Sequence, residues 1–237
     1  GAISLPTSFD WRNSRAVSPV GNRGLLCASD WAFAAVGSLE SSYYIKYNTM
    51  PDLSVQQLLD CSTAYGNTAC LGGTANNAFK YIKEQDGLAT ARSYPYSGVS
   101  TGLICLASTK PKVARVDSYA RITAGNEQDL LGIMVNKGPV AVAINTNNEQ
   151  FINYQGGILD VPNCGNTPAE WFLVVGYGTD NGVDYWTLQS SRGAGWGEKV
   201  HGRFEPGKLR LVARHSNHSA TVLYPNLLPY FDSNEEY

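Results

Sequence analysis

The sequence predicts an α+β fold in which a helical lobe precedes a β lobe. Apolar residues recur with helical spacing in the first half of the chain, whereas short β-branched and aromatic runs dominate the second half. Runs of helices followed by runs of strands are typical of α+β proteins. The 237 residues suffice for one domain of two packed lobes, or for two small domains, with a sizeable core.

Three helices are expected in the first half and one in the second. Ser54 and Gln57 form a capping-box pattern, in which each residue satisfies the other's backbone amide at the start of a helix. Gly138 and Pro139 end the last helix, because both residues interrupt helical structure. The expected helices cover residues 31–45, the segment after Ser54, residues 75–84 and residues 127–136.

Three strands are expected between turn-forming residues in the second half. Each is short, rich in β-branched or aromatic residues, and bounded by Gly, Asn or Pro nearby. They cover residues 140–144, 171–175 and 184–188. The polar tail from 226 to 237 is acidic at its end, and we expect it to be a surface appendage.

Charge and hydropathy argue against several classes of partner. The net charge of -2 and the pI of about 5.9 carry no electrostatic footprint for nucleic acid or for an anionic membrane. No apolar run approaches the roughly 20 residues that span a bilayer. The chain carries no signal-peptide pattern, as expected of a mature chain. A monomer without cofactor is expected.

The five cysteines indicate disulfides rather than a metal site. None forms a CxxC pair and the three histidines lie far along the chain, so no metal site is expected. Four cysteines in the first half could form two disulfides, each worth about 3–4 kcal/mol, which would imply a secreted or endo-lysosomal setting. The odd cysteine is either a buried free thiol or an intermolecular bridge. Asn217 begins the pattern NHS, a possible glycosylation site.

Several motifs, in their family order, resemble papain and the cathepsin L branch of the cysteine proteases. The resemblance covers nearly the whole chain. It is carried by residues 5–12 (LPTSFDWR), 54–61 (SVQQLLDC), 70–73 (CLGG), 138–140 (GPV), 154–158 (YQGGI), 175–178 (VGYG) and 195–198 (GWGE). It implies a single papain-like domain over 1–237, with a helical lobe at about 12–115, a β-barrel-like lobe at about 116–225, a cleft between them, and the acidic tail at 226–237.

The resemblance also implies a disulfide pattern. The family's bridges carry over to Cys27–Cys70 and Cys61–Cys105. A third bridge would join Cys164 to a cysteine near Ser216, which is not one. We therefore expect Cys164 to be the free thiol.

The resemblance further implies that the catalytic positions carry other residues. With one inserted residue in the loop before the first helix, Arg23 falls on the oxyanion-hole glutamine and Asp30 on the nucleophilic cysteine. Glu170 falls on the histidine and Ser190 on the asparagine that orients it. Arg192 replaces a tryptophan that normally shields the histidine–asparagine bond. The resemblance thus implies a protein that has lost its proteolytic machinery.

The chemistry of the new residues agrees with that expectation. Asp30 has no thiolate, and Glu170 cannot shuttle a proton as a neutral imidazole does. No histidine precedes His201, and Cys27 is expected in a disulfide. Two carboxylates at adjoining positions would repel unless neutralised or sharing a proton. We therefore expect an ionic network with Arg23 and Arg192 across the cleft, the alternative being four independent, solvent-facing residues.

Several functions remain open. A peptide or protein could bind the old cleft by backbone pairing with Gly73; the alternative is that Gly72 and Gly73 serve a tight turn. A structural or storage role of the scaffold is close behind. An acid–base enzyme using Asp30 and Glu170, or residual proteolysis, is the alternative from another class. The expected groove residues are Leu71, Gly72, Gly73, Ala169, Arg192 and Trp196.

Overall fold

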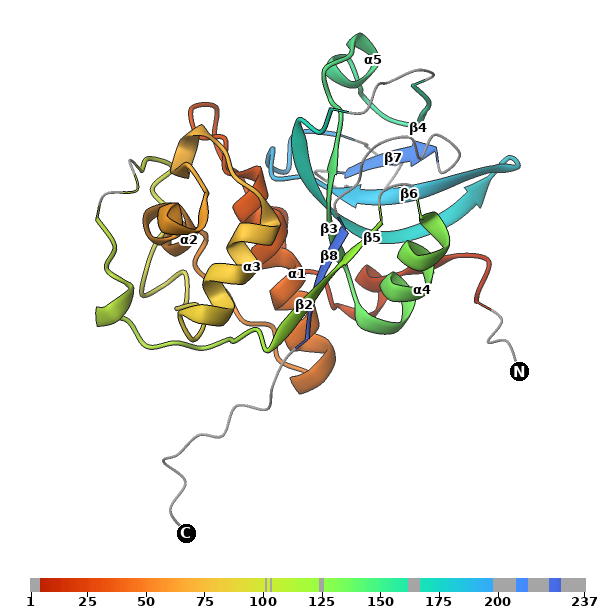
Figure 1. The fold of residues 1–237 in the computed structure, drawn as a ribbon. Coiled ribbons are helices and arrows are strands. Elements are labelled where there is room, and N and C mark those ends of the chain that lie inside the picture. The colour runs from red at the N-terminus through yellow and green to blue at the C-terminus, as the bar shows by residue number, and fades with distance from the viewer. Residues whose placement is uncertain are drawn as a thin grey trace.

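The computed structural model has a helical lobe and a sheet-rich lobe that meet along a long central helix, α1 (Asp30–Tyr47) (Figure 1). The structure describes residues 5–100, 102, 104–123, 126–161, 167–197, 208–212 and 222–226. The other helices are α2 (Val55–Cys61), α3 (Ala75–Glu84), α4 (Glu127–Lys137) and α5 (Glu149–Ile152), with single 3-10 turns at Trp11–Ser14, Thr63–Tyr65, Ala69–Leu71 and Ala107–Thr109.

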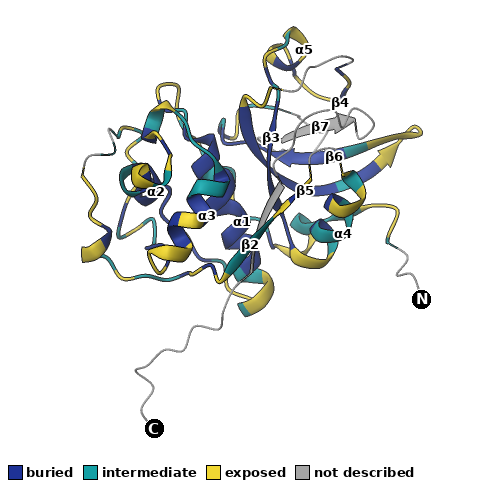
Figure 2. Ribbon diagram, viewed as in Figure 1, coloured by how far each residue is buried: buried dark blue, intermediate teal, exposed yellow. Residues whose placement is uncertain are grey.

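Helix α1 is buried along most of its length because both lobes pack against it (Figure 2). Trp31 and Leu39 are almost fully buried, and α1 contacts α2 and α3 as well as the sheet. The helix ends where Asn48 adopts a left-handed conformation with a φ of 53°, which asparagine tolerates better than most residues. Buried surface all round explains why the sequence here is apolar rather than amphipathic.

Half of the predicted capping box at α2 is wrong. The Ser54 hydroxyl does accept a hydrogen bond from the Gln57 amide at 3.0 Å. The Gln57 side chain, however, does not return to Ser54: it donates to the Tyr81 hydroxyl and to the carbonyl of Gly87, and accepts from the Ala89 amide. Gln57 is fully buried, so its amide satisfies distant buried groups instead of the local cap.

The sheet-rich lobe is built on one open sheet with the strand order β2-β8-β3-β5-β6-β7-β4, and β1 pairs with β5. All pairs are antiparallel except β4 with β7. The lobe expected to be barrel-like therefore holds a sheet that does not close among the described strands. The strands are β1 (Phe9–Asp10), β2 (Ser118–Ile122), β3 (Val140–Ile144), β4 (Ile158–Leu159), β5 (Glu170–Asp180), β6 (Val183–Gln189), β7 (Lys208–Val212) and β8 (Val222–Asn226).

A two-residue hairpin sets the register of β5 and β6. Asn181 and Gly182 connect the strands, and both have positive φ angles, 49° and 78°. This turn geometry matches the right-handed twist of antiparallel strands and favours the Asn-Gly pair. Its register, continued past a bulge near Val174, brings the start of β5 close to the end of β6.

Each lobe has its own hydrophobic core. One surrounds α1, α2 and α3 with Trp31, Phe79 and Ile82, and the other surrounds β3, β5 and β6 with Val142 and Phe172. Both disulfides implied by the resemblance are present, Cys27–Cys70 and Cys61–Cys105. The predicted helical-then-β order is confirmed.

Cys164 and Asn217 lie outside the described residues, as does the tail after 226. Among the helices that the structure describes, none is both long and apolar enough to cross a membrane.

Candidate functional site

The four residues singled out by the sequence converge between the lobes from separate elements. Asp30 begins α1, Glu170 begins β5, and Ser190 directly follows β6. Arg23 lies in the loop before α1. The Arg23 amide donates to the carbonyl of Ser191 at 2.8 Å, and the Arg23 guanidinium lies 3.6 Å from Glu170.

Backbone pairing joins the loop before α1 to the segment after β6. The Gly193 amide donates to the carbonyl of Gly21 at 3.0 Å, and Asn22 and Arg192 form an isolated antiparallel bridge. Residues 21–23 thus run against residues 191–193. This pairing fixes the backbone positions of Arg23 and Arg192.

Glu170 forms the centre of an ionic network. The residue is only 4% exposed. Its carboxylate accepts two hydrogen bonds from Arg192, one from Nε at 2.8 Å and one from Nη2. Such a bidentate pair is the strongest common carboxylate–guanidinium geometry. Arg23 Nη2 adds a contact at 3.6 Å to the same oxygen that accepts from Nε.

The guanidinium of Arg192 contacts two aromatic rings in addition to this carboxylate. It lies 5.2 Å from the ring centroid of Phe151 and 5.4 Å from that of Trp196. A planar guanidinium stacks on aromatic faces as a lysine ammonium would not. Sequence reasoning found Trp196 but missed Phe151, because nothing in the local pattern of α5 points to a distant arginine.

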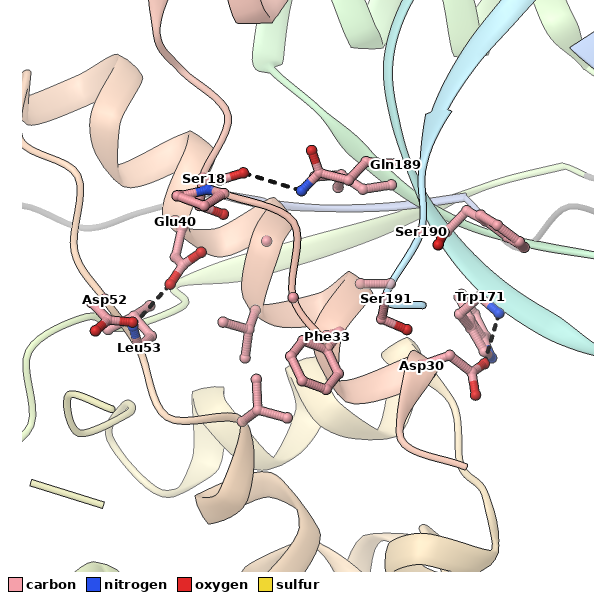
Figure 3. A pocket seen from close by; sticks show the side chains of 18 of the residues that line it. Ser18, Asp30, Phe33, Glu40, Asp52, Leu53, Trp171, Gln189, Ser190 and Ser191 are labelled. Carbon is pink, nitrogen blue, oxygen red and sulfur yellow. Dashed lines mark hydrogen bonds between the residues drawn. The ribbon is translucent and has the colours of Figure 1, made fainter. Parts of the chain in front are cut away.

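Asp30 lies beside the network without joining it by an ion pair among the described residues. Its carboxylate accepts a hydrogen bond from the Trp171 amide at 2.7 Å (Figure 3). Burial raises the pKa of Asp30, and the Glu170 charge raises it further, whereas the Trp171 amide and Arg23 lower it. No hydrogen bond joins the carboxyl groups of Asp30 and Glu170 in the part of the chain described.

The predicted network therefore forms around Glu170, with Asp30 held by a backbone amide instead. Asp30 and Glu170 are buried, and Arg23 and Arg192 both contact Glu170, so the alternative of four independent, solvent-facing residues is wrong. The Ser190 hydroxyl accepts a hydrogen bond from the Arg192 amide at 3.0 Å and so stabilises the turn that carries that arginine.

Both groove glycines have a packing reason. Gly72 has a φ of 131°, which side-chain-bearing residues rarely adopt. A Cβ on Gly73 would lie 2.6 Å from Asn67 Oδ1 and 2.7 Å from the Trp31 ring. Neither the N–H nor the C=O of Gly73 has a hydrogen-bond partner among the described residues, so its peptide groups can pair with an incoming chain.

Exposed apolar residues flank, along the sequence, the two cysteines of the Cys27–Cys70 disulfide. Leu25, Leu26 and Leu71 are 99%, 92% and 89% exposed. Leu25 and Leu26 belong to the loop that carries the inserted residue. Ala169 is also exposed, one residue before Glu170. Sequence reasoning named Leu71 and Ala169 but passed over the adjacent leucine pair.

Asp30 also lines a deeper cavity of about 390 Å³ that runs between the lobes (Figure 3). Glu40 and Ser191 face it as well, and sequence reasoning assigned neither to a site. Glu40 could have been singled out from the sequence, because it is an acid within a largely apolar helix. Among the described residues, no group of three or more His, Cys, Asp or Glu side chains is placed to hold a metal ion.

Comparisons with known proteins agree on one family. The model of the papain family cysteine proteases matches residues 5–222. Cathepsin L of Sarcophaga peregrina is 40% identical over 199 residues, which is 83% of this chain and 58% of that protein. Cathepsin S of Bos taurus is 37% identical over 223 residues, 94% of this chain and 64% of that protein. The chain thus spans less than two thirds of the length of these curated relatives.

Solved structures show the same fold. The bromelain protease of Ananas comosus, in complex with the E64 inhibitor, matches with a TM-score of 0.82 and 34% identity, covering 94% of this chain and 100% of that one. A digestive procathepsin L2 proteinase from the Tenebrio molitor larval midgut matches with a TM-score of 0.85 and 33% identity, covering 95% of this chain and 70% of that one.

Proposed function

Because the chain belongs to the papain family of cysteine proteases, we propose that it is a member that binds peptides in its cleft without cleaving them. The observation that carries the proposal is the state of Glu170, which takes the place of the catalytic histidine. Both of its oxygens accept hydrogen bonds from Arg192. A carboxylate occupied in this way cannot take a proton from a nucleophile and return it to a leaving group.

The nucleophile's position supports the same conclusion. Asp30 begins α1, where a cysteine thiolate would gain from the helix dipole. A carboxylate is a poor nucleophile toward an amide, and the Asp30 carboxylate already accepts from the Trp171 amide. The nearest cysteine in sequence, Cys27, is in a disulfide and has no thiol.

The remaining two positions lack the groups that the reaction needs. The Arg23 guanidinium donates from Nη1 to the carbonyl of Cys27 at 3.4 Å, and its Nη2 lies 3.6 Å from Glu170, so only the buried Nε has no partner among the described residues. The Ser190 hydroxyl accepts from the Arg192 amide. The acid–base alternative finds no support, because Asp30 and Glu170 do not share a hydrogen bond among the described residues.

Features of the groove support peptide binding. The unpaired peptide groups of Gly73 can extend a strand-like ligand by backbone pairing. Leu25, Leu26 and Leu71 form an apolar rim beside it, which would suit apolar side chains of the ligand. Two disulfides favour an oxidising compartment, secreted or endo-lysosomal, as the place where this occurs.

A cleavage assay tests the loss of activity. Fluorogenic peptides and casein are incubated with the protein from about pH 3 to 8, and a thiol-directed epoxide probes for a reactive cysteine. We expect neither turnover nor labelling. Turnover that disappears in Asp30→Asn would overturn the proposal in favour of carboxylate chemistry, whereas turnover that the epoxide abolishes would reveal residual cysteine-protease character.

A binding assay tests the retained groove. Fluorescein-labelled peptides from a casein digest are titrated with the protein and followed by polarisation. Leu71→Glu should weaken binding, whereas Val183→Glu, at the tip of the β5–β6 hairpin away from the groove (Figure 1), should not. Equal binding by the two variants, or no binding by the unmodified protein, would refute the peptide-binding role.

A further inference from the structure

The cavity between the lobes lies between helix α1 and the sheet. It lies against one face of α1, from Asp30 to Glu40, and on its other side against β5 and the end of β6. Pro19 and Asp52, which line it, are exposed, whereas Glu40 and Leu53 are buried, so the buried Glu40 lies at an end of the cavity that has exposed residues beside it. Its volume of about 390 Å³ compares with the roughly 30 Å³ that each liquid water occupies.

Glu40 is the buried acid at this end of the cavity. It is 6% exposed, and its carboxylate accepts a hydrogen bond from the Leu53 amide at 2.8 Å and one from the Ser18 hydroxyl. In Figure 3 the side chain lies near Ser18 and Leu53, at one end of the drawn cavity. Neither partner is a cation, so a charge on Glu40 is not neutralised by the protein.

A second polar group in the cavity lacks a partner. Ser191 is only 4% exposed, and its buried hydroxyl has no hydrogen-bond partner among the described residues. In Figure 3 it points from the end of β6 toward the space between Phe33 and Asp30. Buried hydroxyls in native proteins are nearly always hydrogen-bonded. A water molecule or a polar ligand group inside the cavity would complete its hydrogen bonding.

The charges that line the cavity are of one sign. Asp30, Glu40 and Asp52 line it, and no lysine, arginine or histidine does so among the described residues. The rest of the lining is neutral and largely apolar. These neutral residues are Ser18, Pro19, Gly21, Phe33, Ala34, Val36, Gly37, Met50, Pro51, Leu53, Val55, Trp171, Phe172, Leu173, Gln189, Ser190 and Ser191.

We propose that this cavity binds a small organic ammonium ion, with its charged group at Glu40 and its alkyl chain against the apolar wall. A buried carboxylate without a counter-charge attracts such a cation, because the low-dielectric setting makes the unpaired charge costly. Val36, Leu53 and Leu173 supply apolar surface for the chain. The site is separate from the groove beside Gly73, so it does not depend on the proposed peptide binding.

The charge state of Glu40 makes the site pH-dependent. Burial raises the pKa of Glu40 to about 7, opposed by the Leu53 amide and the Ser18 hydroxyl and aided by the charge of Asp52. Asp52 faces it from the segment before α2 and Asp30 lies on the same helix, whereas the lining from β5 and the end of β6 is neutral. An ammonium ion favours the ionised carboxylate and should therefore bind better above pH 7.

Calorimetric titration with butylamine, which is protonated throughout the range used, tests the proposal against butanol of the same shape. We expect butylamine to bind at pH 8 and to bind roughly thirtyfold more weakly at pH 5.5, since that is the ratio of ionised Glu40 at the two pH values. Butanol should bind much more weakly. Equal affinity for butanol and butylamine would overturn the proposal, as would butylamine binding that does not change with pH.

Variants locate the binding in the cavity. Glu40→Gln should abolish butylamine binding, whereas Glu84→Gln, which removes an exposed acid on α3, should leave it unchanged. Val36→Leu keeps Glu40 but narrows the space proposed for the alkyl chain, and it should weaken binding several-fold, which keeps the proposal testable if Glu40→Gln fails to fold. Unchanged binding in folded Glu40→Gln would show that the amine binds without Glu40, and no binding by the unmodified protein would show that the cavity takes no such cation; either result would overturn the proposal.

Discussion

Replacing Arg192 with methionine tests the ion pair between Arg192 and Glu170 at the boundary of the two lobes. Methionine retains apolar contact with Phe151 and Trp196 but leaves the buried Glu170 carboxylate without its bidentate partner. Removing one member of a buried pair typically costs about 3–5 kcal/mol. Arg192 is 32% exposed and Arg23 remains 3.6 Å from Glu170, so we expect a smaller loss of about 2–3 kcal/mol in the free energy of unfolding.

Urea denaturation at pH 7 measures this loss, and a double-mutant cycle with Glu170→Gln isolates the pair. Because Glu170→Gln removes the buried charge, the second substitution should cost much less in that background, giving a coupling energy of about 2 kcal/mol. Arg192→Lys is the matched control, since it keeps the charge but loses the planar fork of donors. Its free energy of unfolding should fall between those of the unmodified protein and Arg192→Met. A loss below about 0.5 kcal/mol, or additive single substitutions, would refute the reasoning.

Three further predictions concern other parts of the molecule. Burial raises the pKa of Glu40 to about 7, above its unfolded value, so its contribution to stability falls as pH rises from about 4.5 through 7. Above pH 7 the ionised Glu40 carboxylate lowers the free energy of unfolding by roughly 3 kcal/mol, relative to the protein below pH 4.5. Urea midpoints of the unmodified protein should therefore drop relative to Glu40→Gln between pH 5 and 8, and parallel profiles would contradict this. Gly73→Ala should cost about 1–3 kcal/mol, because its Cβ would lie 2.6 Å from Asn67 Oδ1; an unchanged melting temperature would show that the packing yields. Removing the Cys61–Cys105 bridge with serines should cost about 4 kcal/mol by loop-closure entropy, checked by urea unfolding, and a loss under 1 kcal/mol would be inconsistent.

Local patterns predicted the elements whose signal lies in neighbouring residues. The expected bounds of α3 and β3 agree with the structure, and the helix expected at 127–136 extends by one residue to Lys137. The pairing of β8 with β2 and β3 could not be predicted, because strand partners so far apart in the sequence leave no local periodicity. Gln57 fits a capping box by sequence, yet tertiary contacts redirect its side chain.

The four residues around Glu170 were predictable, but their pairing was not, and neither was the part of the site formed by Phe151, Glu40 and Ser191. Resemblance to a family located Arg23, Asp30, Glu170 and Ser190, and their convergence follows from the fold. Which acid each arginine contacts depends on side-chain placement that the sequence does not encode locally. Glu170 takes both arginines because it begins β5 beside the end of β6, whereas Asp30 meets the Trp171 amide across the lobe boundary.

The backbone pairing of residues 21–23 with residues 191–193 has a consequence for how any ligand enters the cleft. These hydrogen bonds tie the two walls together at one end, so spreading the walls there would break main-chain contacts. A ligand therefore meets a surface already in its final shape and loses little free energy to reorganising the protein. Discrimination between ligands then rests on fit and charge, and mismatched ligands should differ mainly in how quickly they leave.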